Sequence, residues 1–419
     1  MFQFSSELEM MTLNLDIIQS IAFTTVVLLI GSFIKSKVYV LNKYCIPAPV
    51  VGGFSFAIIA FILRQTGVIT IVFDTTLQNI LMTAFFTTVG FTASLQVLKK
   101  GGTQVIKFLI VAVMLVLAQN IVGILSAKAI GVDPLLGLIA GSVSMTGGHG
   151  ASGAFGPIME ANGLEGALSI AMACATFGLV SGSIIGGPLA NRLVQKHKLQ
   201  PEEIGVKEEV ISTNAHGEAS YSEISCDEAS IGKLSESKLT SSAMQIIIAM
   251  GLGTIVSNLF SDIGITMPAY IGAMIVAAIM RNISDAKGIW PIASNELESL
   301  GSICLSLFLS MAMCSLKLWE LVDLAIPILI LLTLQTLLMI LFAYFITFRV
   351  MGKDYTAAVL ASGHCGFGLG ATPNGIANMK SVTSKYGPAP NAFFILPLVG
   401  ALFIEFLNSA VITTLMNLL

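Results

Sequence analysis

Charged residues are scarce in this chain of 419 residues, at 11% of the sequence, whereas soluble domains carry about 25%. Hydrophobic residues make up 55%, and the mean hydropathy is +0.88. This composition excludes a soluble globular domain. It predicts a protein that crosses a membrane several times.

Cysteine and histidine are also few, with six and four residues. The cysteines are scattered and show neither the spacing of a metal site nor a disulfide framework. His149 and His364 each lack a second ligand three or four residues away, which favours hydrogen-bonded structural histidines over a metal centre. The N-terminus has no basic cluster, so we expect no cleaved signal peptide.

The charges that are present gather in one segment. Residues 191–241 hold 15 of the 45 charged residues, 6 basic and 9 acidic. A segment this rich in Glu, Ser and Lys cannot bury a core, so we predict a flexible linker there. It separates two hydrophobic halves, residues 1–190 and 242–419.

Each half contains five apolar stretches that approach the length of about 20 residues needed to span a bilayer. The expected spans lie near 14–34, 46–64, 78–98, 104–130 and 164–190, and near 242–260, 267–284, 297–317, 322–349 and 391–416.

Pairs of residues also match at an offset of 221 or 222: Pro47 and Pro268, Asp133 and Asp354, Gly147 and Gly368, and Gly178 and Gly400. We therefore predict a duplication. Because five is odd, the two repeats would be inverted in the membrane.

Two glycine-rich stretches precede the last span of each half, at 134–157 and 355–375. The first contains SMTGGHGASG over residues 144–153, and the second contains ASGHCGFGLGATP over residues 361–373. Glycine and proline at this density break a helix and let the backbone approach a solute. We expect two re-entrant segments that form one transport site, as in secondary transporters built from inverted repeats. Tight helix packing through small residues is the competing interpretation.

Basic residues set the expected orientation, because they favour the cytoplasmic side. With the N-terminus outside, Arg64, Lys128 and Lys317 alone fall outside, while fifteen basic residues and the linker fall inside. Both termini would then lie outside, and the linker in the cytoplasm. The first re-entrant segment would enter from outside and the second from inside, which suits alternating access.

The chemistry of these segments favours an anionic solute transported with a cation. Freed N–H groups and helix N-termini bind carboxylates, and freed carbonyl groups bind small cations. The candidate substrate-binding residues are Ser144, Thr146, Gly147, Gly148, His149, Gly150, Ser152, Gly363, His364, Gly366, Gly368, Gly370, Thr372 and Asn374. Gln119, Asn120 and Gln335 lie in mid-span, where they either line the site or bond neighbouring helices.

Glu405 lies inside the last expected span, and an ionisable residue there is a functional hypothesis by default. Asn408 follows one turn later on the same helix face. We predict that both bind the co-transported cation. The alternative is a protonated glutamic acid that bonds a neighbouring helix.

These segments resemble the bacterial sodium/glutamate symporter family. The second glycine-rich motif is the most specific match, supported by GGHG at 147–150, YCIPAPVVGG at 44–53, AMACATFGLV at 171–180 and SLKLWEL at 315–321. The resemblance implies sodium-coupled uptake of L-glutamate across the bacterial inner membrane. It also implies ten spans, two re-entrant segments and a homodimer that moves as an elevator. The expected fold is therefore an all-α polytopic membrane protein that is not an enzyme, with no cofactor and no nucleic-acid partner.

Two other functions fit parts of the sequence. Residues 150–153, GASG, match the G-x-S-G of rhomboid intramembrane proteases, but so short a pattern is weak in a glycine-rich chain and leaves the duplication unexplained. A passive channel is the stronger alternative. It would let solute leak without a sodium gradient, whereas a symporter would not accumulate solute without one.

Overall fold

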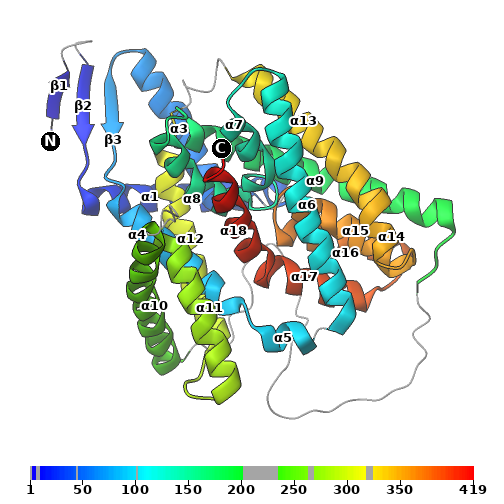
Figure 1. Ribbon diagram of the computed structural model, residues 1–419. Coiled ribbons are helices and arrows are strands. Elements are labelled where there is room, and N and C mark those ends of the chain that lie inside the picture. Colours follow the sequence, from blue (N-terminus) through cyan, green and yellow to red (C-terminus); the bar gives the residue numbers. More distant parts are fainter. Residues whose placement is uncertain are drawn as a thin grey trace.

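The computed structural model describes residues 2–5, 10–43, 46–100, 102–201, 235–262, 269–317 and 324–419. Within these ranges the chain is mostly helical, with a small sheet near the N-terminus (Figure 1). Most of the predicted linker, residues 202–234, lies outside the described residues. The elements are β1 (Phe2–Ser5), β2 (Met10–Asn14), α1 (Ile17–Lys37), α2 (Tyr39–Lys43), α3 (Ala48–Gln65), β3 (Ile69–Val72), α4 (Thr76–Thr92), α5 (Leu95–Lys100), α6 (Gly102–Ala129), α7 (Pro134–Leu138), the π-helix η1 (Ile139–Val143), α8 (Gly148–Ala161), α9 (Ala167–His197), α10 (Glu236–Asp262), α11 (Ala269–Lys287), α12 (Ser294–Cys314), α13 (Ala325–Phe342), the π-helix η3 (Ala343–Thr347), α14 (Phe348–Val350), α15 (Tyr355–Gly368), α16 (Thr372–Tyr386), α17 (Pro390–Leu402) and α18 (Ile404–Met416).

The sheet corrects the expectation of an all-α chain. Strand β2 pairs antiparallel with β1 and parallel with β3, with Leu13 opposite Ile71. Strand β3 is a run of β-branched residues, Ile69–Val72, which suits a pleated surface better than a helix. The first helix also begins later than expected, because the Asp16 side chain caps α1 by accepting a hydrogen bond of 2.8 Å from the backbone N–H of Gln19.

Eight helical stretches among the described residues are long and apolar enough to cross a membrane. They coincide with eight of the ten expected spans. The other two, near 78–98 and 267–284, correspond to α4 and α11. Helix α4 has 17 residues, and the last two turns of α11 carry Arg281, Asp285 and Lys287.

The long helices pack into two groups; in Figure 1, α10 and α11 lie at the left and α13 to α16 at the right. The six-helix group contains the first three long helices of each half: α1, α3 and α4 with α10, α11 and α12. The broken-helix group contains α6 to α9 and α13 to α18, and holds most of the buried apolar residues. Contacts within each group are more extensive than contacts between the groups.

Matching glycines join the first two long helices of each half. A Cβ atom at Gly31 of α1 would lie 2.6 Å from the backbone nitrogen of Gly52 in α3. A Cβ atom at Gly272 of α11 would lie 2.2 Å from the carbonyl oxygen of Gly253 in α10. Gly31 and Gly253 are 222 positions apart and Gly52 and Gly272 are 220 apart, so a close glycine contact recurs near the offset read from the sequence.

The two glycine-rich segments each form a broken helix. The first consists of α7 and η1, a turn at 144–147, and α8. Gly141 within η1 is non-helical, with φ −81° and ψ −135°. The second consists of α15, a break at 369–371, and α16. Pro373 stands in the first turn of α16, where its missing N–H is tolerated.

The first segment is broken at fewer positions than its glycines suggest. Gly150, Gly153 and Pro157 lie inside α8, which continues to Ala161. A Cβ atom at Gly153 would lie 2.7 Å from the Phe308 ring of α12, so this glycine allows close packing. Only the breaks at Gly141 and residues 144–147 separate α7 from α8.

Candidate functional site

The two broken helices touch where Gly148 meets Gly370. Gly148 begins α8 with φ +55°, a conformation that favours glycine. A Cβ atom there would lie 2.6 Å from the carbonyl oxygen of Gly370, which belongs to the break between α15 and α16. Any side chain at position 148 would therefore separate the two breaks.

Helices α8 and α16 both begin at the breaks, and neither N-terminus is capped by a side chain. The N-cap residues are Gly147 and Ala371, and neither makes a side-chain cap hydrogen bond. An α-helix leaves its first N–H groups without intrahelical partners and carries partial positive charge at that end. The site thus combines the N-termini of two helices, α8 with 14 residues and α16 with 15 residues, and both N-termini attract anions.

Gln119 of α6 connects the two breaks. Its Nε2 donates a hydrogen bond of 2.7 Å to the carbonyl oxygen of Gly368, and its Oε1 accepts one of 2.7 Å from the Thr146 hydroxyl. Gln335 of α13 donates to the Gln119 carbonyl at 2.8 Å. From the sequence, these mid-span amides either line the site or bond neighbouring helices. In the structure Gln119 bonds both broken segments and Gln335 bonds Gln119, so they fix the position of one break relative to the other.

Asn408 of α18 brings the last helix to the first break. Its Nδ2 donates to the carbonyl oxygen of Ser142 at 3.1 Å, and it would lie 2.9 Å from a Cβ atom at Gly147. The backbone N–H of Ser142 donates to Oδ1 of Asn120 at 3.0 Å. The buried Oδ1 of Asn408 has no hydrogen-bond partner among the described residues.

Glu405 lies one turn before Asn408, just after the interruption at Phe403 between α17 and α18. Its side chain is half-buried. Within the described part of the chain, the Glu405 carboxylate makes no hydrogen bond or ion pair with another side chain. The structure therefore does not bring Glu405 into the polar contacts of the breaks, although it brings Asn408 there.

Ser144 and Ser152 face α9. Both hydroxyls donate to the carbonyl oxygen of Ala171, at 3.0 and 3.2 Å, and the Ser152 hydroxyl also lies 3.1 Å from the Ser144 oxygen. Ser152 is the serine of the G-x-S-G pattern, and its partners are Ser144 and a backbone carbonyl rather than a histidine. This geometry does not favour a protease.

Both histidines are hydrogen-bonded, as the sequence indicated. Nε2 of His149 lies 3.0 Å from the Thr176 hydroxyl of α9, and Nδ1 of His364 lies 2.9 Å from the Thr347 hydroxyl. His364 is fully buried, and the ring of Phe367 stacks on it. His149, in the first turn of α8, is therefore the histidine nearer the contact of the breaks.

The glycines of α15 lie against side chains and backbone of neighbouring helices. A Cβ atom at Gly363 would meet Leu396, one at Gly366 the backbone of Asn374, and one at Gly368 the Leu115 side chain at 2.6 Å. Here the packing interpretation of glycine applies. Gly150 differs, because a Cβ atom there would meet only the Phe85 ring, at 3.6 Å.

The first turns of α16 attach to α9 through two asparagines. Nδ2 of Asn374 donates to the Leu179 carbonyl at 3.0 Å, and Nδ2 of Asn378 donates to the Gly182 carbonyl at 2.9 Å. Oδ1 of Asn374 is buried and has no hydrogen-bond partner within the described ranges. Thr372 is half-buried at the start of α16. Asn378 was not among the sequence candidates, although its spacing of four from Asn374 on one helix face could have indicated it.

The comparisons with known proteins point to one family. A family model described as "Sodium/glutamate symporter" matches residues 13–388. Proteins named sodium/glutamate symporter from Escherichia coli and Haemophilus influenzae are each 41% identical to this chain, over 95% and 94% of it and 97% and 95% of their own lengths. A solved sodium proton antiporter from Methanocaldococcus jannaschii covers 96% of the chain and 98% of its own, with 13% identity and a TM-score of 0.42. That score is too low to support a conclusion about this fold.

Proposed function

The chain belongs to the sodium/glutamate symporter family, and we propose that its two broken helices form the site where glutamate binds. The protein is a secondary transporter that takes up glutamate together with sodium, and it is not an enzyme. The observation that carries the site proposal is the contact of Gly148 with Gly370, where two uncapped helix N-termini begin side by side.

L-glutamate has two carboxylates, and the site has two helix ends suited to anions. One carboxylate binds the first-turn N–H groups of α8, at Gly148, His149 and Gly150, assisted by the side chain of Thr146. The other binds at the start of α16, with Gly370, Thr372 and Asn374. This arrangement accounts for a dicarboxylate site without an arginine in the middle of the membrane.

The remaining candidate residues hold the helices of this site in place and do not contact glutamate. Ser144 and Ser152 fix α8 to α9 through the Ala171 carbonyl, and Gly147 leaves room for Asn408. Gly363, Gly366 and Gly368 allow α15 to approach its neighbours, and His364 anchors it to η3. Their contribution to glutamate binding is positional.

Sodium binds beside the first break, with Glu405 and Asn408 as side-chain ligands. The buried, unpartnered Oδ1 of Asn408 supports this, because the same amide lies at the first break, where its Nδ2 donates to the Ser142 carbonyl. Unwound backbone carbonyls next to a broken helix are the oxygen ligands that transporters offer to sodium. Glu405 lies in the turn of α18 before Asn408 and would supply the charged ligand.

The broken-helix group moves against the six-helix group, as in an elevator. The division of each repeat between the two groups supports this, since the first three helices of both halves form one body and the broken helices form the other. In this proposal residues 1–190 and 242–419 are inverted five-span repeats, with re-entrant segments 134–157 and 355–375. Residues 191–241 link them in the cytoplasm, and both termini are periplasmic. The protein works as a homodimer in the bilayer of the bacterial inner membrane.

Uptake of labelled L-glutamate into proteoliposomes tests the transport mechanism directly. An inward sodium gradient should drive accumulation above the outside concentration, and removal of the gradient should abolish it. Equilibration of glutamate at the same rate with and without sodium would instead indicate a passive channel.

A further inference from the structure

A cavity of about 420 Å³ lies between α4 and α12 of the six-helix group. Its lining includes Thr88 and Thr92 of α4, Glu298 and Ser302 of α12, and Arg281 of α11. The volume falls in the range of small-molecule pockets, about 300–1,000 Å³. Its wall is mostly apolar, as in most small-molecule pockets, with hydroxyl groups, a cation and a carboxylate among the lining residues.

The inner end of this cavity reaches the first broken helix. Phe85 of α4 lines the cavity, and its ring lies 3.6 Å from the position of a Cβ atom at Gly150 in α8. The Phe85 ring centroid is 5.9 Å from that of Phe308, which packs on Gly153 of the same helix. Two aromatic rings therefore separate the cavity from the first turns of α8.

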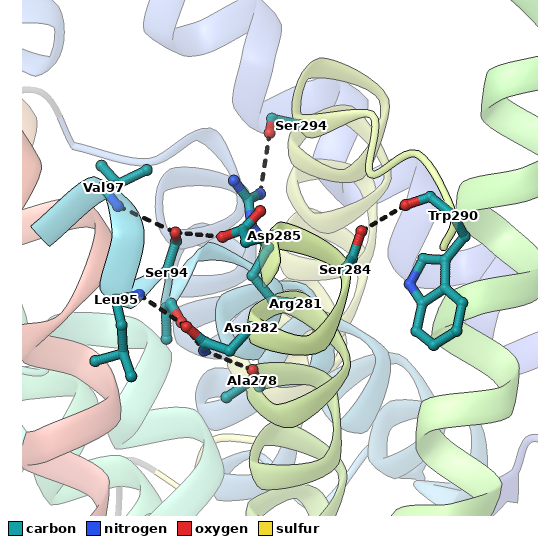
Figure 2. Close-up of polar contacts among 11 residues, drawn as sticks. Ser94, Leu95, Val97, Ala278, Arg281, Asn282, Ser284, Asp285, Trp290 and Ser294 are labelled. Carbon is teal, nitrogen blue, oxygen red and sulfur yellow. Dashed lines mark hydrogen bonds and ion pairs between the residues drawn. The ribbon is translucent and has the colours of Figure 1, made fainter. Parts of the chain in front are cut away.

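At the mouth, the guanidinium of Arg281 is held in place by its neighbours (Figure 2). Its Nε donates to the Asp285 carboxylate at 3.1 Å, and its Nη1 donates to the Ser294 hydroxyl at 3.4 Å. The Ser94 hydroxyl donates to the same oxygen of Asp285 at 2.5 Å. Nη2 of Arg281 makes no hydrogen bond within the described ranges, so a fixed cationic group with a free donor faces the cavity.

We propose that this cavity is a second binding site for the transported amino acid, a vestibule between the glutamate site and the water on the Arg281 side of the membrane. The proposal rests on the function proposed above. Arg281 binds a carboxylate of glutamate, since a preorganised guanidinium forms strong charge-assisted hydrogen bonds. Glu298, exposed on α12 one turn after Ser294, attracts the ammonium group. The rings of Phe85 and Phe308 then part to admit the amino acid to α8.

Transport measured from each face separately tests this vestibule. In inside-out and right-side-out vesicles, Arg281→Gln should raise the glutamate KM about tenfold on the Arg281 face, the loss of one charge-assisted hydrogen bond. On the opposite face the KM should change less than twofold. Arg281→Lys, which keeps the charge, should recover part of the loss. Arg349→Gln, on an exposed arginine over the Phe345 ring, is the matched control and should change neither face.

Ser302→Trp provides an independent variant, because Ser302 is exposed at the cavity wall and the change does not disturb the Arg281 contacts. Its bulk should fill the cavity and slow transport selectively from the Arg281 face. Equal changes on both faces, or none in either variant, would overturn the vestibule. So would an Arg281→Gln effect that disappears in liposomes without anionic lipid, which would assign the arginine to lipid headgroups. Failure of the wild-type protein to show sodium-driven uptake would instead refute the proposed function.

Discussion

Asp133 and Asp354 each cap the start of a broken helix with their side chains, and 221 positions separate them. The Asp133 carboxylate accepts from the backbone N–H of Leu135 at 2.8 Å at the start of α7, and Asp354 accepts from Ala357 at 2.7 Å at the start of α15. Each aspartate thus fixes the point at which its segment turns back. Both segments therefore begin with a side-chain cap, at positions that match in the two halves of the sequence.

Removal of either cap should destabilise the protein by a similar amount. Asp133→Ala and Asp354→Ala should each cost about 1 kcal/mol, the usual effect of losing an N-cap side chain. Thermal unfolding of the purified protein would show this as similar decreases in Tm for the two variants. Glu165→Ala, on an exposed carboxylate, serves as the control. A large loss at one aspartate and none at the other would argue against equivalent caps.

The sequence indicated the broken helices because their glycine density exceeds what packing requires, but it did not locate the breaks. Gly153 and Gly368 lie in helices and accommodate Phe308 and Leu115, whereas Gly148 adopts a positive φ. A glycine that allows packing and one that ends a helix look alike in a single sequence. The spacing of neighbouring helices, which decides between them, depends on residues far away in the chain.

The roles of polar residues in mid-span also depend on partners far away in the chain. Gln119 and Asn408 bond the backbone carbonyls of Gly368 and Ser142, at separations of 249 and 266 residues. Hydropathy finds the spans that carry such residues, since about 20 apolar residues suffice to cross a bilayer. It cannot show which backbone groups a break leaves free, so the partners of these amides became visible only in the fold.

A side chain at Gly148 should stop transport. Gly148→Val places a β-branched residue at φ +55° and against the Gly370 carbonyl, so the two breaks must separate. Uptake should fall about tenfold or more, equivalent to about 1.4 kcal/mol in the barrier. Gly368→Val should reduce uptake as much, through its clash with Leu115. Gly251→Ala in α10 is the control, since a Cβ atom there meets nothing within 4 Å among the described residues. Near-normal uptake in a well-assembled Gly148→Val protein would contradict the site.

Gln119 and Thr146 should act as one unit. Gln119→Leu leaves the Gly368 carbonyl and the Thr146 hydroxyl without this partner, and Thr146→Val removes the other end of the same bond. Each variant should slow glutamate uptake, and the loss in the double variant should be smaller than the sum of the two single losses. The measurement is a double-mutant cycle on initial uptake rates. Strictly additive losses would show that the two side chains act separately.

Topology reporters would test the inverted repeats. A reporter that is active only in the cytoplasm should work when inserted at residue 215 and fail when fused after residue 419. Basic residues gather on the linker side of the expected spans, which is the physical reason for this orientation. The opposite pattern would reverse the assignment of both termini, and activity at both sites would require an even number of spans in the second half.

Sodium binding by Glu405 gives the last prediction. A carboxylate inside a membrane span is costly unless a partner offsets its charge, and no basic side chain is bonded to Glu405 among the described residues. A sodium ion shared with Oδ1 of Asn408 would provide that partner. Glu405→Gln keeps the shape but removes the charge, so the half-saturating sodium concentration should rise severalfold while glutamate affinity at saturating sodium changes little. Asn408→Ser should shift the sodium dependence in the same direction, because it withdraws the neighbouring ligand. Unchanged sodium dependence in a well-assembled Glu405→Gln protein would mean that Glu405 is a protonated acid bonded to a neighbouring helix.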